Sequence, residues 1–248
     1  MNTTSELQTD YRKSHLGKGA DYDSALSEGP FDHYMTQHQL GILARVLKKL
    51  YPNGVPRYMD FACGTGRITQ FVEEMATESV AVDVSATMLA EARKKCRYTT
   101  FRLCDITQDS VDFEPFNLVS AFRFFGNAQD ELRVSALQAI HSLMVDGGYL
   151  VFNNHRNPWS LARFLRRCRG ERSDVDLSYS KIKRLLRSTG FTIHRSYGIG
   201  WWIMRHRWNT SQYLDSRLAR FLEPLSRSRW LAPFCPDYVV VAQKKRLS

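Results

Sequence analysis

The feature that most constrains this chain is an apolar segment that ends in an acid and runs into a Gly-x-Gly turn. Residues 58–66 read Tyr-Met-Asp-Phe-Ala-Cys-Gly-Thr-Gly, and a second apolar segment ends in Asp83. Between them, apolar residues recur at helical spacing. This order predicts a strand, a tight turn that lets a ligand approach the backbone, a helix, and a second strand whose acid binds a ribose. The sequence therefore predicts a site for a cofactor that contains a nucleoside.

The residues around the turn distinguish between two kinds of nucleoside cofactor. A dinucleotide-binding turn takes a third small residue three positions after its second glycine, and Thr69 stands there instead. The carboxylate of Asp60 would repel a pyrophosphate but attract a positively charged amino group. On these residues the chain resembles the class I S-adenosylmethionine-dependent methyltransferases. Asp60–Gly66 corresponds to their acid-x-Gly-x-Gly-x-Gly motif, with Ala62 in the first glycine position.

The resemblance implies further cofactor contacts along the chain. Asp83 would hold both ribose hydroxyls, Met88 would lie against the adenine, and Asp105 with the Ile106 backbone would bind the adenine edge. A turn-forming role for Asp105 and a helix-terminal role for Asp83 stay open as alternatives. The expected contacts with S-adenosylmethionine are Asp60, Ala62, Gly64, Gly66, Asp83, Val84, Met88, Asp105, Ile106, Phe122 and, from the N-terminal arm, Tyr22, with Tyr11 and Tyr34 as further lid candidates.

Strand and helix patterns alternate along the chain, which predicts an α/β fold with a doubly wound parallel sheet. The resemblance implies seven strands, the last of them antiparallel. We expect a single domain with an N-terminal arm and helix over residues 1–50, a Rossmann-like core over residues 57–199, a small helical cap over residues 200–236, and a last strand and tail over residues 237–248. The helix before Gly54 is expected from Leu40 onward, and the cap helix is expected to end at Pro224.

Charge is distributed unequally along the chain. Residues 151–248 contain 20 Lys and Arg residues against 6 Asp and Glu residues, and they hold all five tryptophans. Basic residues interleaved with aromatic ones suit an anionic, partly apolar surface. Three interpretations stay open. They are a membrane surface or lipid-linked substrate, RNA held by stacking and phosphate contacts, and a solvated basic surface with the tryptophans inside a substrate cap.

The predicted acceptor side of the site follows the fourth and fifth strands. A sulfonium methyl is already activated, so the protein mainly aligns an acceptor and excludes water. His155 is the candidate general base for an oxygen acceptor, and Arg123 and Arg156 are candidate substrate ligands. A capping or solvent-exposed role for His155 stays open, and His15 and His33 are alternatives from the arm. No Asn-Pro-Pro-Tyr/Phe sequence follows the fourth strand, which argues against amino methylation of adenine or glutamine.

The cysteines and the absence of a long apolar segment bear on cofactor type and cellular location. The five cysteines stand singly, which suggests neither a metal site nor a redox motif. With no secretory signal or long apolar run, we expect a cytoplasmic protein, with contact to the inner face of the membrane as an option. The expected function is O-methylation of an anionic or lipid-linked small molecule or glycan. An RNA or nucleotide methyltransferase, a non-catalytic S-adenosylmethionine-binding protein and a dehydrogenase are the alternatives.

Overall fold

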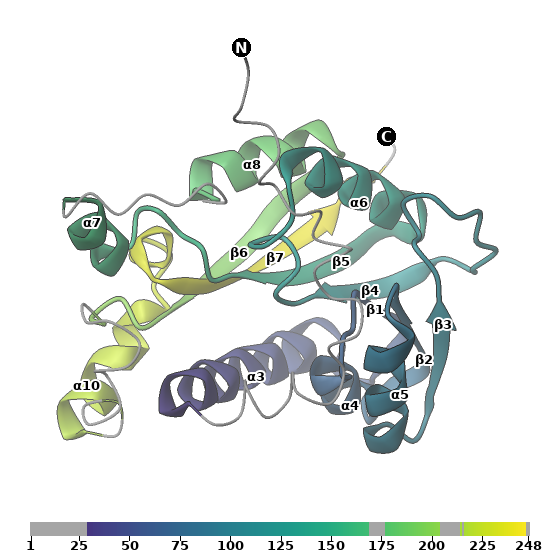
Figure 1. Cartoon of the computed structure of the whole chain (residues 1–248), viewed down its shortest axis with the longest axis horizontal. Helices are drawn as coiled ribbons and strands as arrows, with labels where there is room; N and C mark the ends of the chain where they lie inside the picture. The colour runs from purple at the N-terminus through teal and green to yellow at the C-terminus, as the bar shows by residue number, and fades with distance from the viewer. Residues whose placement is uncertain (1–28, 169–176, 204–213, 215, 247–248) are drawn as a thin grey trace, which may run out of the picture.

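The chain forms one seven-stranded sheet, seen in a computed structural model that describes residues 29–168, 177–203, 214 and 216–246 (Figure 1). The strands are β1 (Val55–Phe61), β2 (Ala76–Asp83), β3 (Thr99–Leu103), β4 (Phe116–Ala121), β5 (Met144–Asn154), β6 (Phe191–Ile199) and β7 (Asp237–Lys244). Their order across the sheet is β3-β2-β1-β4-β5-β7-β6. Only β7 runs antiparallel to its neighbours β5 and β6. The predicted seven-stranded, mostly parallel sheet is confirmed.

Helices cover both faces of the sheet. They are α3 (Pro30–Leu50), α4 (Arg67–Glu73), α5 (Ala86–Lys95), α6 (Asp130–Ser142), α7 (Leu161–Cys168), α8 (Tyr179–Ser188) and α10 (Arg217–Ser226), with the 3-10 helix η2 (Ala232–Phe234). Figure 1 shows α6 and α8 on one face and α3, α4 and α5 on the other. Each face has its own core of buried apolar side chains. No helix among the described residues is long and apolar enough to cross a membrane.

The alternation of side chains along β1 decides which groups face which helices. Met59 and Phe61 pack in the core under α6 and α8, whereas Tyr58 packs in the core under α3 and α4. Successive side chains of a strand point to opposite faces, so Asp60 shares the face of Tyr58. The acid that ends the first strand therefore lies under α3 and α4, beside the turn.

Two predicted helix boundaries were wrong. α3 begins at Pro30 rather than near Leu40, since proline suits the first turn of a helix and the early α3 residues are buried against the C-terminal part of the chain. α10 continues through Pro224 to Ser226. The last turn persists because Glu223 and Ser226 are held by hydrogen bonds to the backbone at Gly200 and Trp201.

Candidate functional site

A cavity of about 450 Å³ lies at the carboxyl ends of β1, β2 and β4. The turn after β1, the ends of β2 and β3, the loop after β4 and the first part of α3 form its walls. This edge of an open α/β sheet, where the strand order reverses beside β1, is where such folds bind ligands. The volume is that of a small-molecule site.

The turn after β1 lies close to the cavity because three of its residues have left-handed backbone conformations. Ala62, Gly64 and Gly66 have φ angles of 53°, 55° and 79°. A Cβ atom added to Gly64 would meet nothing within 4 Å, so a ligand can approach its backbone, whereas a Cβ atom on Gly66 would lie 2.9 Å from the Cβ of Ala92 in α5. Gly64 thus keeps the cavity open, Gly66 lets α5 pack, and Ala62 tolerates a conformation that favours glycine.

Asp60 is buried in the cavity wall and held by two hydroxyl groups. Its carboxylate accepts hydrogen bonds from Thr69 Oγ1 at 2.6 Å and Ser120 Oγ at 2.5 Å. The Tyr58 hydroxyl lies 2.7 Å from the same Ser120 oxygen. Burial raises the pKa of Asp60 to about 6, against the opposing effect of these hydrogen bonds and of nearby Arg67. Thr69, the residue that departs from the dinucleotide pattern, therefore positions the acid.

Asp83 reaches the cavity with both oxygen atoms fixed by the backbone. Oδ2 accepts the Gly64 N–H at 2.8 Å, and Oδ1 accepts the Ser85 N–H at 2.9 Å. Ser85, not Asp83, caps α5, because its side chain accepts a hydrogen bond from the Met88 N–H. Asp83, Val84 and Met88 all line the cavity. Asp83 therefore presents a fixed carboxylate to the cavity, and its contact with a ribose stays a prediction.

Asp105 also lines the cavity, and it forms a turn as well. Its Oδ1 accepts hydrogen bonds from the Thr107 N–H at 3.0 Å and the Thr107 hydroxyl at 2.6 Å. The two roles considered for Asp105 are therefore compatible. The side chain of the next residue, Ile106, packs in the core, so any contact of Ile106 with a ligand would come from its backbone.

The order of the strands places three acids of the cavity side by side. Asp105 follows β3, Asp83 is the last residue of β2, and Asp60 is the residue before the end of β1; these strands are neighbours in that order. Phe122 and Arg123 follow β4 on the other side of β1, and both line the cavity. Arg123 has a left-handed backbone with φ of 61°, and its N–H donates to Asn153 Oδ1 at 2.6 Å. Arg67 and Lys95 also line the cavity, so Arg123 is the cation that lies on the β4 side of β1.

A chain of buried polar side chains connects the backbone of Arg123 to the side chain of Arg67, which also lines the cavity. The Asn153 amide donates to both oxygens of Asp237 at 3.1 Å. Asp237 accepts from Gln39 Nε2 at 2.6 Å, and Gln39 Oε1 accepts from Arg67 at 3.1 Å. Burial raises the pKa of Asp237. Sequence reasoning missed Gln39, Asn153 and Asp237; the only signal was the acid at the start of the last apolar strand.

The structure does not bring every predicted residue to the cavity. His155 packs over Gly126, its Nε2 is 3.2 Å from Asn127 Oδ1, and it is not part of the cavity wall. Arg156 donates to the same Asn127 oxygen at 3.1 Å. Their position after β5 suggested the substrate side, but both side chains contact Asn127 of the loop after β4, and neither residue lines the cavity. Tyr11, His15 and Tyr22 lie outside the described residues.

Two residues of α3 complete the wall. His33 and Thr36 line the cavity. α3 therefore brings to the cavity His33, which was an alternative to His155 as the candidate base. Tyr34 points elsewhere and donates its hydroxyl hydrogen to Glu223 at 2.8 Å. Helical spacing explains the division, since positions 33 and 36 share a face that 34 does not.

The residues present fit S-adenosylmethionine. The open backbone at Gly64 admits an adenosyl group, and Asp83 and Asp105 face the cavity as acceptors for hydroxyl and amino hydrogens. Asp60 offers a carboxylate to the cofactor's positively charged amino group. A pyrophosphate would meet three acids there, which is unfavourable.

Comparison with known proteins agrees with this geometry. Residues 59–148 match the family described as "Methyltransferase domain". The chain is 24% identical over 140 residues to a putative methyltransferase of Geobacillus sp. (strain WCH70), covering 54% of each protein. It is 30% identical over 97 residues to the malonyl-[acyl-carrier protein] O-methyltransferase of Salmonella typhimurium, covering 38% of this chain and 37% of that one. The chain spans about half the length, or less, of the curated relatives it matches.

Solved structures share the fold over most of the chain. A possible histamine N-methyltransferase from Thermotoga maritima gives a TM-score of 0.62 at 18% identity, covering 91% of this chain and 95% of that one. Magnesium protoporphyrin IX methyltransferase from Synechocystis PCC 6803, with bound S-adenosylhomocysteine, gives 0.57 at 16% identity, covering 87% and 85%. At such identities the likeness concerns the fold, while the acceptors of these proteins differ from one another.

Proposed function

We propose that this chain, a member of the class I S-adenosylmethionine-dependent methyltransferases, methylates an oxygen atom of an anionic small molecule. The observation that carries the proposal is the position of Arg123, which lines the cavity after β4, on the other side of β1 from Asp83 and Asp105. The acids suit the cofactor, and Arg123, whose guanidinium lies 3.8 Å from Asp32, offers a cation to the acceptor. A free, glycan-borne or lipid-linked anion would meet the same arginine.

The cofactor, when bound, supplies an activated methyl group on its sulfonium sulfur. The protein's own part is to hold the two reactants in line and to exclude water. Thr69 and Ser120 fix Asp60, and the backbone N–H groups of Gly64 and Ser85 fix Asp83, so these acceptors need no rearrangement when the cofactor enters. Such preorganisation lowers the cost of binding.

A carboxylate is the acceptor that this cavity suits best. Carboxylates are ionised at neutral pH, so they need no general base, and an arginine can orient them through paired hydrogen bonds. The predicted base His155 does not line the cavity. Two curated relatives are malonyl-[acyl-carrier protein] O-methyltransferases, which supports oxygen as the methylated atom. A hydroxyl acceptor is the second candidate, because His33 does line the cavity and could accept its proton.

The test is methyl transfer from S-adenosylmethionine with a labelled methyl group into a bacterial extract, followed by mild alkali. A methyl ester of a carboxylate releases volatile labelled methanol, whereas a methyl ether or a methylated base does not. We expect alkali-labile label in the small-molecule or lipid fraction, retained in His33→Asn. Alkali-stable label that His33→Asn abolishes would favour a hydroxyl acceptor, and label in RNA would contradict the proposal.

A matched pair of variants then tests the acceptor end of the cavity. Arg123→Gln should raise KM for the purified acceptor at least tenfold and leave the affinity for S-adenosylhomocysteine within about twofold. Arg102→Gln removes an exposed arginine outside the cavity and serves as the control. Equal effects of the two substitutions would contradict an acceptor-binding role for Arg123. Cofactor binding without methyl transfer to any fraction would favour a non-catalytic protein.

A further inference from the structure

Exposed apolar side chains cluster at one end of the molecule. Among the described residues eleven large apolar side chains are exposed, and nine of them lie in two segments, 159–165 and 218–234. Figure 1 shows α7 and α10, which carry most of these residues, at the end of the molecule away from β3. The exposed set is Trp159, Leu161, Phe164, Leu165, Leu218, Phe221, Leu225, Trp230 and Phe234, here called the apolar end.

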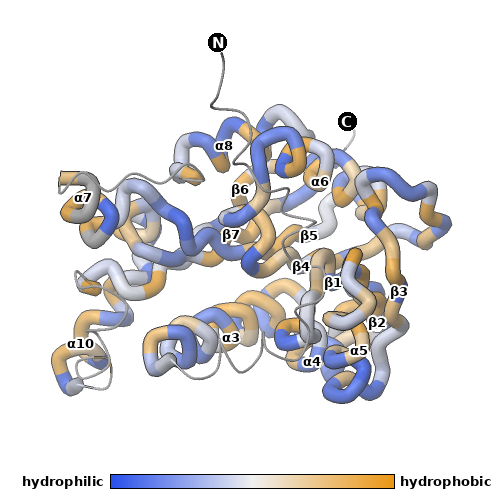
Figure 2. The backbone as a smooth tube through the Cα atoms, viewed as in Figure 1, coloured by the Kyte–Doolittle hydropathy of each residue, from blue (hydrophilic) through white to orange (hydrophobic). Residues whose placement is uncertain are grey.

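The helix α10 has its polar side buried and its apolar side exposed. Leu218, Phe221 and Leu225 follow one face of the helix and are 65%, 74% and 47% exposed. The opposite face carries Glu223 and Ser226, which are buried. A surface helix of a globular protein ordinarily has the reverse arrangement. Figure 2 shows the alternation of hydrophobic and hydrophilic residues along this helix.

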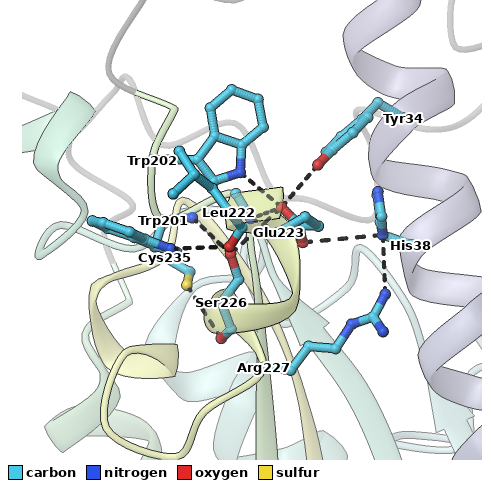
Figure 3. Close-up of polar contacts among 10 residues, drawn as sticks. Tyr34, His38, Trp201, Trp202, Leu222, Glu223, Ser226, Arg227 and Cys235 are labelled. Carbon is cyan, nitrogen blue, oxygen red and sulfur yellow. Dashed lines mark hydrogen bonds and ion pairs between the residues drawn. The ribbon is translucent and has the colours of Figure 1, made fainter. Parts of the chain in front are cut away.

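Hydrogen bonds fix α10 in this orientation (Figure 3). Glu223 accepts from the Tyr34 hydroxyl at 2.8 Å, from Trp202 Nε1 at 3.0 Å and from the Gly200 N–H at 3.1 Å. Rotating the helix to bury Phe221 would break all three bonds and strand buried polar groups. The apolar face of α10 is therefore held outward.

The second helix of the apolar end also exposes apolar side chains. Leu161, Phe164 and Leu165 lie at helical spacing on α7, and all three are exposed. The Asn157 amide, just before α7, donates to the carbonyl oxygens of Pro233 and Cys235, each at 2.8 Å. This contact ties the start of α7 to the turn around η2, which carries Trp230 and Phe234.

The exposed charges in the described segments of the apolar end are of one sign. Arg217, Arg220 and Arg229 are exposed, and the guanidinium of Arg229 lies over the Trp230 ring at 5.8 Å from its centre. Glu223 and Asp237 are the acids in the described segments 155–168 and 216–237, and both are buried inside the protein. The outer surface there is apolar and cationic.

We propose that the apolar end docks on an anionic lipid surface. Aromatic and leucine side chains enter the boundary between headgroups and acyl chains, while arginines on the same end bind the anionic headgroups. RNA fits less well, because exposed leucines offer no stacking surface for bases. This inference goes beyond the methyl transfer proposed above and does not depend on it.

Vesicle co-sedimentation of the full chain tests the proposal. We expect binding to vesicles of phosphatidylglycerol mixed with phosphatidylcholine, and little binding to phosphatidylcholine alone. The triple variant Arg217→Gln, Arg220→Gln, Arg229→Gln should bind about 100-fold more weakly. The double variant Phe221→Ser, Trp230→Ser should lose more than tenfold.

Controls come from the opposite end of the molecule, at β3 and α5. In the part of the chain that the structure describes, Tyr98 and Leu103 are the two exposed large apolar residues outside the apolar end, and Tyr98→Ser, Leu103→Ser should leave vesicle binding unchanged. The exposed residues Arg93, Arg97 and Arg102 give a matched triple Arg→Gln control. Circular dichroism and thermal melting establish that each variant is folded.

Three results would overturn the proposal. The first is no sedimentation of the wild-type chain with the anionic vesicles. The second is equal loss of binding in the variants of both ends, which would indicate nonspecific attraction. The third is a dimer in analytical ultracentrifugation that Phe221→Ser, Trp230→Ser dissociates, since a second copy would then cover the apolar end. Failure to find a methyl acceptor leaves this test unaffected, because the vesicle assay needs neither acceptor nor cofactor.

Discussion

Asp60 and Glu223 are two buried carboxylates in different regions of this molecule, and their surroundings differ. Asp60 is held by Thr69 and Ser120 and lies in the wall of a cavity. Glu223 accepts hydrogen bonds from Tyr34, Trp202 and Gly200, all within the protein. Burial raises the pKa of both groups. A buried acid with a raised pKa therefore indicates a binding site only where the structure leaves space beside it.

The largest effect should come from removing Glu223, which does not line the cofactor cavity. Glu223→Ala leaves four donors, on Tyr34, Gly200, Trp202 and Ser226, without their acceptor, and we expect the free energy of unfolding to fall by about 3 kcal/mol. Urea unfolding measures this, with the exposed Glu114→Ala as a control that should change it by less than about 0.5 kcal/mol. A loss below about 1 kcal/mol would mean that α10 is not anchored through Glu223.

The acids of the cavity should behave in the opposite way. Asp83→Ala should weaken binding of S-adenosylhomocysteine by about 100-fold, because a fixed bidentate acceptor for the ribose is lost. Isothermal titration calorimetry gives the affinity, and Asp112→Ala removes an exposed acid outside the cavity wall as the control. Near-normal affinity in Asp83→Ala would contradict the assignment of the ribose site.

The pH dependence of binding separates Asp60 from a structural acid. Its pKa in the folded chain is raised to about 6 from an ordinary value of 3.8, so the folded state holds the proton more tightly than the unfolded chain between these values. The contribution of Asp60 to the free energy of unfolding therefore falls as the pH rises from about 4 to 6. Over the same pH range Asp60 ionises to the carboxylate that would bind the cofactor's amino group. We expect affinity for S-adenosylhomocysteine to rise about tenfold per pH unit below pH 6 and to level off above it. Calorimetry on Asp60→Asn should show no such rise, and a parallel rise in that variant would refute the role of Asp60.

The smallest effect concerns the backbone of the turn. Ala62→Gly relieves a left-handed alanine with φ of 53°, and the added flexibility of the unfolded chain offsets part of the gain. The free energy of unfolding should rise by about 0.5 kcal/mol. The reciprocal change Gly66→Ala should lower it by about 2 kcal/mol or more, because the new Cβ atom would meet Ala92 at 2.9 Å. Thermal unfolding of both variants measures these two changes in stability. An Ala62→Gly protein less stable than the wild type would contradict the backbone strain inferred at Ala62.

Features that depend on neighbours in the sequence could be predicted. The apolar segments around Asp60 and Asp83 predicted the two strands and the turn and helix between them, because each of these elements has a local sequence pattern. The positions of Asp83 and Asp105 at the cavity follow from the rule that parallel strands end at one edge of the sheet. The family resemblance then supplied the number of strands and the antiparallel direction of the last one.

Features that depend on distant contacts could not be predicted. His155 follows a strand that ends at the cavity edge, but the loop at Gly126–Asn127 lies beside its ring. The chain Gln39–Asp237–Asn153 joins three elements far apart in sequence. The apolar periodicity predicts which side chains share one face of α10. Such a face is ordinarily buried. In this protein the hydrogen bonds of Glu223 hold the opposite, polar face inward, and the apolar face is exposed.

The hydrogen bonds of α3 also set an order of assembly. Tyr34 contacts Glu223 and Gln39 contacts Asp237, which are 189 and 198 positions further along the chain. A chain emerging from the ribosome contains β1 to β4 and the three acids of the cavity long before these partners are synthesised. Closing such long loops costs entropy that only the final contacts offset. α3 can pack on β1 and α4 early, but we expect its Tyr34 and Gln39 contacts to form last, so that its N-terminal part is held at the cavity only once β7 is in place.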